Sequence, residues 1–363
     1  MKTNFTDVLK SLCLTPAPSG FEGEIAYKIY DYCKPFCDQI TMDNIGNVIG
    51  AITGTNPLLK PILVNAHMDR VGFIVSMIHD DGFLQMRAIG SPNIKVLPGL
   101  TVQVRKKDHS AWIPVVCGIK CTHRITGTET DVMPSLEDVM FDTGASTAEE
   151  VRNLGIEIGC PAVFTPSFVH LAGNVVCGTA IDNCGSVAAL ITVAAKLSKS
   201  RPMRTVYIAA NVWEEYNQRA SSFLIRKYQP IAAINMDMLL AADTIDLKGC
   251  MQSYLGKGPA ASCFNFSLDN NVGCIAHEGL YGIAEESALS CGIPLQRYVS
   301  GGCGDNAYAM FQEDGPAVIE IGAPVRYAHS SCEVADLSDI KNTSIVITEM
   351  IHRIKESFRQ NRY

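Results

Sequence analysis

The chain has 363 residues, with 30 Lys and Arg against 37 Asp and Glu, which gives a formal net charge of −7. Apolar residues make up 47% and charged residues 18% of the chain, so disordered and collagen-like classes are excluded. At about 150 residues per domain, the length predicts two domains, each large enough to bury a core without disulfides.

Charge and hydropathy also limit the partners. The sequence has no run of about 18 uncharged apolar residues that could span a membrane, and residues 1–11 lack the apolar segment of a secretory signal. We therefore expect a cytoplasmic protein without a membrane partner. Lys- and Arg-rich runs are absent, so we do not expect nucleic acid as a partner. The 14 cysteines form no CxxC pair and are expected to be reduced thiols.

The first part of the chain alternates helical and strand-like segments. Residues 1–14 have helical spacing of apolar side chains, at Phe5, Val8, Leu9 and Leu12. Ser19 followed by Glu22 fits a capping box that begins a second helix. Buried strands are predicted at residues 48–52 and 61–66.

The pattern changes to short β-like runs broken by Gly and Pro between residues 71 and 170, with one helix predicted at 147–154. Such spacing is typical of a small all-β unit and favours a barrel. The predicted strands are 72–77, 83–88, 100–105, 112–119 and 162–169.

The α/β alternation resumes after residue 174, with a helix at 186–197 and strands at 204–212, 231–236 and 317–321. This alternation predicts a largely parallel sheet with helices on both faces. We therefore expect a discontinuous α/β domain formed by residues 1–70 and 171–363, into which residues 71–170 are inserted as a small β-barrel domain.

Metal-capable side chains follow several predicted strands, at the sheet edge where α/β proteins place their functional groups. His and carboxylate are ligands for zinc and similar ions, and five such groups are too many for one tetrahedral catalytic site. They suit two neighbouring ions with a bridging carboxylate and a free carboxylate as general base. The groups are His67 and Asp69, Glu214 and Glu215, Asp237, His329, and Asp182 before the small-residue helix.

These residues, in this order and spacing, resemble the tetrahedral aminopeptidases, family forty-two of the metallopeptidases, some of whose members were once described as endoglucanases. The resemblance covers nearly the whole chain. It is carried by Ala66-His67-Met68-Asp69, Asp182, Glu214-Glu215, Asp237 and Arg326-Tyr327-Ala328-His329-Ser330, and by Thr15-Pro16-Ala17-Pro18-Ser19-Gly20 near the start.

The resemblance implies a zinc-peptidase-like α/β/α domain with a mixed sheet and an inserted barrel. It implies two divalent ions per chain, Zn²⁺ or Co²⁺, that activate water for release of N-terminal residues from peptides with a free N-terminus. It further implies a homo-oligomer, a tetrahedral dodecamer built from dimers through the β domain.

The resemblance also implies a role for each residue of the site. His67 and Asp237 would bind one metal, and Glu215 and His329 the other, with Asp182 bridging them. Glu214 would be the catalytic base and Asp69 would orient His67.

Two further residues are candidates for substrate binding. Arg326 is either a ligand for a substrate carbonyl or carboxylate, or a structural ion-pair partner. His123 either reaches a neighbouring subunit's site or belongs to the barrel.

Two alternative functions remain open. Asn183 and Cys184 stand where the family usually has Asp and Arg, which leaves open a non-catalytic member whose site has drifted. A glycoside hydrolase is the other alternative, although its acid pair does not require the surrounding His and Asp ligands.

Overall fold

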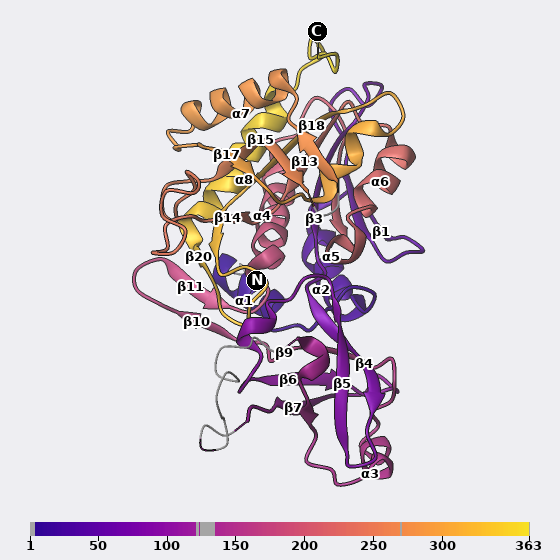
Figure 1. The fold of residues 1–363 in the computed structure, drawn as a ribbon. Coiled ribbons are helices and arrows are strands. Elements are labelled where there is room, and N and C mark those ends of the chain that lie inside the picture. The colour runs from indigo at the N-terminus through magenta and orange to yellow at the C-terminus, as the bar shows by residue number, and fades with distance from the viewer. Residues whose placement is uncertain (1–3, 121–122, 124–134, 269–270, 363) are drawn as a thin grey trace.

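A computed structural model of the chain describes residues 4–120, 123, 135–268 and 271–362. Figure 1 shows a layered α/β part, where both described ends of the chain lie, and a small barrel of strands beside it.

The larger sheet has four adjacent parallel strands at its centre, and antiparallel strands complete it on both sides. Three of these four strands are buried along their whole length and the fourth is buried except at the half-buried Tyr207, as expected where helices cover both faces of a sheet. In the described part of the chain the strands are, in order across the sheet, β1 (Gln39–Met42), β2 (Val48–Ile52), β12 (Val206–Asn211), β3 (Ile62–His67), β13 (Ala232–Met236), β18 (Ala317–Gly322), β15 (Ala260–Ser267) and β16 (Val272–Ile275), with β17 (Gln296–Ser300) paired to β15.

Helices cover both faces of this sheet (Figure 1). Because side chains alternate between the faces of a strand, Ile62 and Val64 of β3 pack into the main core with α4 and α8, whereas Leu63 packs with α6 on the opposite face. The helices of this part are α1 (Phe5–Cys13), α2 (Gly23–Cys33), α4 (Ile181–Leu197), α5 (Glu214–Asn217), α6 (Ala220–Tyr228), α7 (Glu278–Ser290) and α8 (Leu337–Arg353), with single-turn 3₁₀ helices at Lys34–Phe36, Asp305–Ala307 and Ala309–Phe311.

The barrel is closed by six antiparallel strands in the described residues and has its own core. Phe73 and Phe141 are fully buried in it, and the rings of Phe73 and Phe164 meet edge to face at 5.4 Å. Its strands are, in order around the barrel, β4 (Gly72–Ile78), β5 (Phe83–Ile89), β8 (Phe141–Asp142), β7 (Trp112–Cys117), β6 (Thr101–Arg105) and β9 (Pro161–Phe164), accompanied by α3 (Ala148–Asn153) and 3₁₀ turns at Ile94–Val96 and Leu136–Asp138.

A second sheet lies at the carboxyl side of the large one. Its strands are, in order, β10 (Phe168–His170), β11 (Val175–Gly178), β20 (Glu333–Asp336), β19 (Pro324–Arg326) and β14 (Leu239–Leu240).

The predicted fold class is confirmed: a mixed α/β sheet with helices on both faces and a small β-barrel. One detail of the prediction was wrong. The single strand expected at 162–169 is divided, because β9 closes the barrel whereas β10 pairs with β11 outside it. The boundaries of the proposed insertion, residues 71–170, stay a prediction. In the described part of the chain, no helix has both the length and the apolar character that a membrane crossing requires.

Candidate active site

The candidate site lies at the carboxyl ends of the central strands, on the face that α6 covers. Along this face, each strand changes from apolar to polar toward its carboxyl end. Leu63 is followed by Asn65 and His67, Ala233 by Asn235 and Asp237, and Val318 by Glu320. Because parallel strands end at the same edge, these polar side chains come together there.

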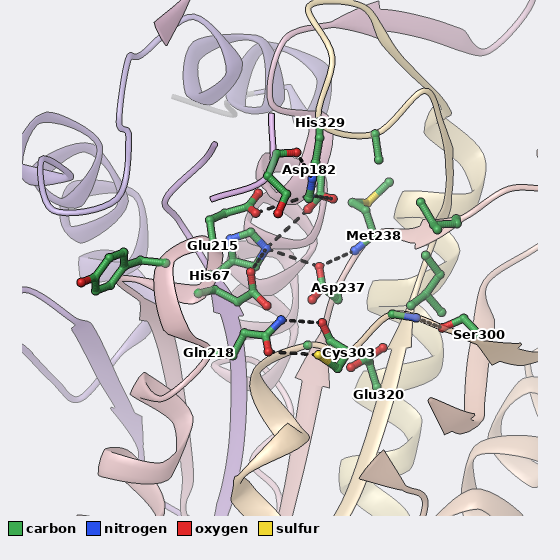
Figure 2. Close-up of a pocket in the computed structure, with 18 of the residues that line it drawn as sticks. His67, Asp182, Glu215, Gln218, Asp237, Met238, Ser300, Cys303, Glu320 and His329 are labelled. Atoms are coloured by element: carbon green, nitrogen blue, oxygen red, sulfur yellow. Dashed lines mark hydrogen bonds and ion pairs between the residues drawn. The ribbon is translucent and has the colours of Figure 1, made fainter. Parts of the chain in front are cut away.

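His67 and Asp237 meet Asp182 at this edge (Figure 2). His67 Nε2 lies 3.4 Å from Asp182 Oδ1 and 3.4 Å from Asp237 Oδ1, and 3.8 Å from Glu214 Oε2. Ligand atoms of His67, Asp182 and Asp237 all lie within 4.8 Å of one another. All three side chains are buried, so this group is suited to enclose one ion.

Asp182 also faces a second histidine. Its Oδ2 lies 3.9 Å from His329 Nε2, and the same nitrogen lies 3.4 Å from Glu215 Oε2 (Figure 2). His329 Nδ1 lies 3.0 Å from the carbonyl oxygen of Ser91, which fixes the ring with Nε2 toward the carboxylates. The two oxygens of Asp182 therefore face two different histidines.

The backbone beside these residues is strained at non-glycine positions. Ala180 (φ 55°), Trp213 (φ 62°) and His329 (φ 62°) adopt the left-handed conformation, which L residues rarely take. Each such residue costs about 1–3 kcal/mol and is typical of functional sites. These residues are His329 itself and the close chain neighbours of Asp182 and Glu214, so the turns that aim the cluster are strained.

Asp69 acts mainly on the backbone of the Glu pair. Its Oδ1 accepts a hydrogen bond from the Glu214 N–H at 3.0 Å, and its Oδ2 accepts from the Glu215 N–H at 3.1 Å and from Ser19 Oγ at 2.6 Å. His67 Nδ1 lies 3.1 Å from the Asp69 carbonyl oxygen and 3.6 Å from its carboxylate. Contact between Asp69 and His67 thus runs chiefly through the main chain.

The capping box predicted at Ser19 and Glu22 was wrong, because both side chains bind elsewhere. The Ser19 hydroxyl donates to Asp69, and α2 has no side-chain cap. Glu22 Oε1 accepts hydrogen bonds from the N–H groups of Gly20 and Trp213.

Glu333 is a buried residue that sequence reasoning missed. Its Oε2 accepts from the Asp182 N–H and its Oε1 from the His329 N–H, both at 2.8 Å. One side chain therefore fixes the main chain of two candidate ligands. Its position in the sequence, four residues after His329, carries no signal of this role.

Negative charge dominates the electrostatics of the site. Burial raises the pKa of Glu214 well above its usual range and that of Glu215 to about 7, and neighbouring carboxylates add to both shifts. Burial alone would lower the pKa of His67, but the charges of Glu214 and Asp237 outweigh it and raise that pKa well above its usual value. The neighbouring carboxylates thus raise the pKa values of both the Glu pair and His67. The site has an excess of buried negative charge, which bound cations would neutralise.

The donor set fits divalent metal ions. Imidazole nitrogens and carboxylate oxygens are the ligands of catalytic zinc and related ions. Asp182 Oδ1 is buried, and beyond the 3.4 Å contact with His67 Nε2 it has no hydrogen-bond partner in the described structure. A buried carboxylate oxygen with so little compensation is costly unless a cation lies against it.

A cavity of about 540 Å³ opens in front of this cluster. One wall carries the candidate ligands. The other walls are formed by residues 216–219 and 238–240 and by Tyr298, Ser300, Gly302, Cys303, Gly304, Tyr308 and Glu320. Figure 2 labels Gln218, Met238, Ser300, Cys303 and Glu320 among them. The cavity therefore joins the metal-capable cluster to a space large enough for an amino-acid residue and its neighbour.

Comparison with known proteins agrees with this site. Residues 46–345 match the family model described as M42 glutamyl aminopeptidase. The chain is 29% identical to the lysyl aminopeptidase of Pyrococcus furiosus, over 96% of this chain and 97% of that protein. The chain belongs to the M42 glutamyl aminopeptidase family.

Solved structures of relatives have the same fold. The aminopeptidase APDkam598 of Desulfurococcus kamchatkensis superposes with a TM-score of 0.90 at 30% identity, covering 96% of this chain and 94% of that one. The TET1 peptidase of Pyrococcus horikoshii, which can assemble into a tetrahedron or a large octahedral shell, superposes with a TM-score of 0.85 at 28% identity, covering 96% of this chain and 99% of that one.

Family membership makes the protein a metal-dependent aminopeptidase, a hydrolase of peptide bonds. The predicted reaction class is thereby confirmed.

The two candidate substrate-binding residues lie outside the cavity lining. Arg326 donates from Nε and Nη2 to the two oxygens of Asp243, each at 2.7 Å, so it forms the structural ion pair that the sequence left as its alternative. His123 is exposed, and its reach into a neighbouring subunit stays a prediction.

Arg219 is the arginine that lines the cavity, and sequence reasoning missed it. It is exposed, and its guanidinium lies over the Tyr308 ring, 5.1 Å from the ring centre. The signal that could have identified it is an arginine only four residues after the Glu pair.

Proposed function

We propose that the protein is a two-metal aminopeptidase in which Asp182 bridges the ions. His67 and Asp237 would hold one ion, and Glu215 and His329 the other. The observation that carries this proposal is that Asp182 Oδ1 faces His67 and Asp182 Oδ2 faces His329. When bound, the ions supply positive charge that lowers the pKa of water and polarises the scissile carbonyl.

The chain's own residues would then perform the proton transfer. Glu214 lies at the cavity wall beside the cluster and is the carboxylate left for a base once the ligands are assigned. It would take a proton from water and return it to the leaving amine. Asp69 would support this step by holding the N–H groups of Glu214 and Glu215, so that one carboxylate points to the ligand cluster and its neighbour to the substrate.

The substrates would be peptides with a free N-terminus, since the known relatives are aminopeptidases. Arg219 at the cavity rim would bind a substrate carbonyl, because an arginine offers several donors in a fixed fork. The relatives' names include both lysyl and glutamyl aminopeptidases, so the names do not fix the preferred residue.

We also propose Zn²⁺ or Co²⁺ as the metal and a tetrahedral dodecamer as the assembly. The His and carboxylate donor set supports either ion. The assembly is supported by the tetrahedron that the Pyrococcus horikoshii relative forms and by the exposed barrel, which would provide the contacts.

The experiment is to strip the protein with a chelator and assay aminoacyl p-nitroanilides and short peptides before and after adding Zn²⁺ or Co²⁺. We expect metal-restored release of N-terminal residues and no release from the same peptides when they are N-acetylated. Glu214→Gln should keep wild-type metal content and lose about 10²–10⁴-fold in kcat.

Near-wild-type kcat in Glu214→Gln would remove Glu214 from the role of base. A folded, metal-loaded protein that is inert on every peptide would favour the non-catalytic alternative. Chelator-resistant hydrolysis of a β-glucan would favour a glycosidase.

A further inference from the structure

The inner wall of the cavity carries a carboxylate that the proposed mechanism does not use. Glu320 lies on β18, is only 5% exposed and lines the cavity near Cys303 (Figure 2). In the described part of the chain no Lys, Arg or His nitrogen lies within 4.0 Å of it, and its strongest charged neighbours are the carboxylates of Asp237 and Asp305. A buried carboxylate without a cation is costly unless a ligand supplies one.

A row of amides fixes this carboxylate in place. Asn65, Asn235 and Glu320 are register partners on the adjacent strands β3, β13 and β18. Asn235 Oδ1 accepts from Asn65 Nδ2 at 2.8 Å, so the Asn235 amide N–H points to Glu320 Oε2, at 3.5 Å. From β15, Asn265 Nδ2 lies 3.3 Å from Glu320 Oε1. The network thus presents amide hydrogens to Glu320 from both sides but no positive charge.

The charges elsewhere in the site do not neutralise it. The two proposed ions would be shared among the carboxylates of Asp182, Glu215 and Asp237, and Glu320 belongs to neither of the candidate metal groups. Arg219 is exposed at the rim, where it stacks on Tyr308. Burial and the neighbouring carboxylates raise the pKa of Glu320 to about 8. Its negative charge at the inner wall is therefore uncompensated by the chain, and a cationic group of a bound substrate would supply the missing partner.

We propose that Glu320 selects substrates whose N-terminal residue is basic, with its carboxylate receiving the ammonium or guanidinium group of a Lys or Arg side chain. This inference rests on the aminopeptidase function proposed above. Met238, Leu240 and Tyr298 line the same cavity and provide apolar surface for the methylene stem of such a side chain. A side chain with a charged group at the end of a long apolar stem would contact both the Glu320 carboxylate and this apolar surface.

Two other readings of the same cavity give different results. If Glu320 instead bound the α-ammonium group, every substrate would depend on it equally, since every N-terminal residue carries that group. If Arg219 set the preference, acidic N-terminal residues would be favoured and Glu320 would not matter.

The test compares kcat/KM for Lys, Met and Glu p-nitroanilides in the metal-loaded wild type, in Glu320→Gln and in Asp305→Asn. Met is the neutral side chain closest to Lys in length. Asp305 is the matched control, because it is a fully buried carboxylate near the same cluster that does not line the cavity. Circular dichroism and metal content verify that each variant is folded and loaded, and Glu320→Asp, which keeps the charge, replaces Glu320→Gln if that variant does not fold.

We expect the wild type to prefer Lys over Met, and Glu320→Gln to lower the Lys to Met ratio by about tenfold or more, with the Met value nearly unchanged. Asp305→Asn should keep the wild-type ratio. In Glu320→Asp the ratio should fall less than in Glu320→Gln, because the charge remains but is withdrawn by one methylene.

Equal losses of kcat/KM on Lys and Met substrates in Glu320→Gln would overturn the proposal and indicate that Glu320 binds the α-ammonium group. A wild-type preference for Met or Glu over Lys would also overturn it and indicate another determinant of specificity. A binding measurement separates this result from failure of the proposed function. Calorimetry with L-lysinamide and L-norleucinamide, on Glu214→Gln with and without Glu320→Gln, requires no turnover. Tighter binding of lysinamide that depends on Glu320 supports the proposal, and equal binding of the two amides overturns it.

Discussion

Gly304 lies where the inner wall and a proposed metal ligand meet. A Cβ at this position would lie 2.6 Å from Glu320 Oε2, 2.9 Å from Asp237 Oδ2 and 3.2 Å from Asn235 Nδ2. The backbone of Gly304, with φ −119° and ψ −167°, is one that any residue adopts, so the effect of Gly304→Ala comes from these contacts alone.

The size of the effect follows from the distances. Ordinary contact begins near 3.4 Å, so the oxygen of Glu320 has to move by about 0.8 Å and that of Asp237 by about 0.5 Å. Metal–ligand distances tolerate only about 0.2 Å. We therefore expect Gly304→Ala to weaken metal affinity, and with it kcat/KM, by about ten- to a hundredfold.

The assay is metal titration by calorimetry together with kcat/KM on a neutral substrate. Gly302→Ala is the control: it lies in the same loop and lines the same cavity, but its Cβ would meet only Ser300 Oγ, at 3.9 Å. It should leave both quantities within about twofold of wild type. Wild-type metal affinity in Gly304→Ala would refute the reasoning, because the loop rather than the two carboxylates would then have yielded.

Further substitutions test the remaining parts of the site. Asp182→Ala should lower the metal content from two ions per chain toward none, measured by mass spectrometry, and unchanged binding of two ions would contradict the bridging role. Glu333→Gln should weaken metal binding by about tenfold, because one amide oxygen cannot accept from both the Asp182 and His329 N–H groups. Full metal affinity in this variant would show that these two hydrogen bonds are not needed for metal binding. Arg326→Gln should leave kcat/KM within about twofold and lower the free energy of unfolding by about 1 kcal/mol, from the lost pair with Asp243, and a rise in KM without loss of stability would return Arg326 to substrate binding.

The central strands could be predicted because their sequence is mostly apolar, with polar residues only toward their carboxyl ends. The residues after them could be predicted because parallel strands end together. His67 and Asp237 needed no more than that rule. Asp182 could be named as a candidate ligand from its place before a small-residue helix, but its bridging role depended on family resemblance. It stands at the distorted start of α4, where φ and ψ of Asp182 and Asn183 are not helical. The spacing of apolar residues in the sequence does not predict such a turn.

Other elements could not be predicted from the sequence because their partners are distant. Residues 260–300 contain β15, β16 and β17, which form the far edge of the sheet and have mixed burial patterns, and the helix α7. Tertiary pairing, rather than local pattern, decides such edge strands. The role of Glu333 could not be predicted for a similar reason. It accepts hydrogen bonds from two N–H groups that are close to it only in the folded chain.

The amide row on the α6 face links the specificity proposal to the fold. Asn65 and Asn235 lie on the two strands that also supply His67 and Asp237, two residues further along. Burying two amides in the middle of an apolar sheet is unfavourable unless their hydrogen bonds are satisfied, and Asn65 Oδ1 has no partner in the described structure. The arrangement is explained if the row serves to hold Glu320, because a carboxylate at the inner wall needs donors that fix it without neutralising it. An aliphatic residue at position 320 would make the row unnecessary. Because Asn65 donates to Asn235, both amides have to be replaced together. Glu320→Leu combined with Asn65→Leu and Asn235→Leu should therefore recover stability lost in Glu320→Leu alone, while selectivity for basic N-terminal residues stays lost.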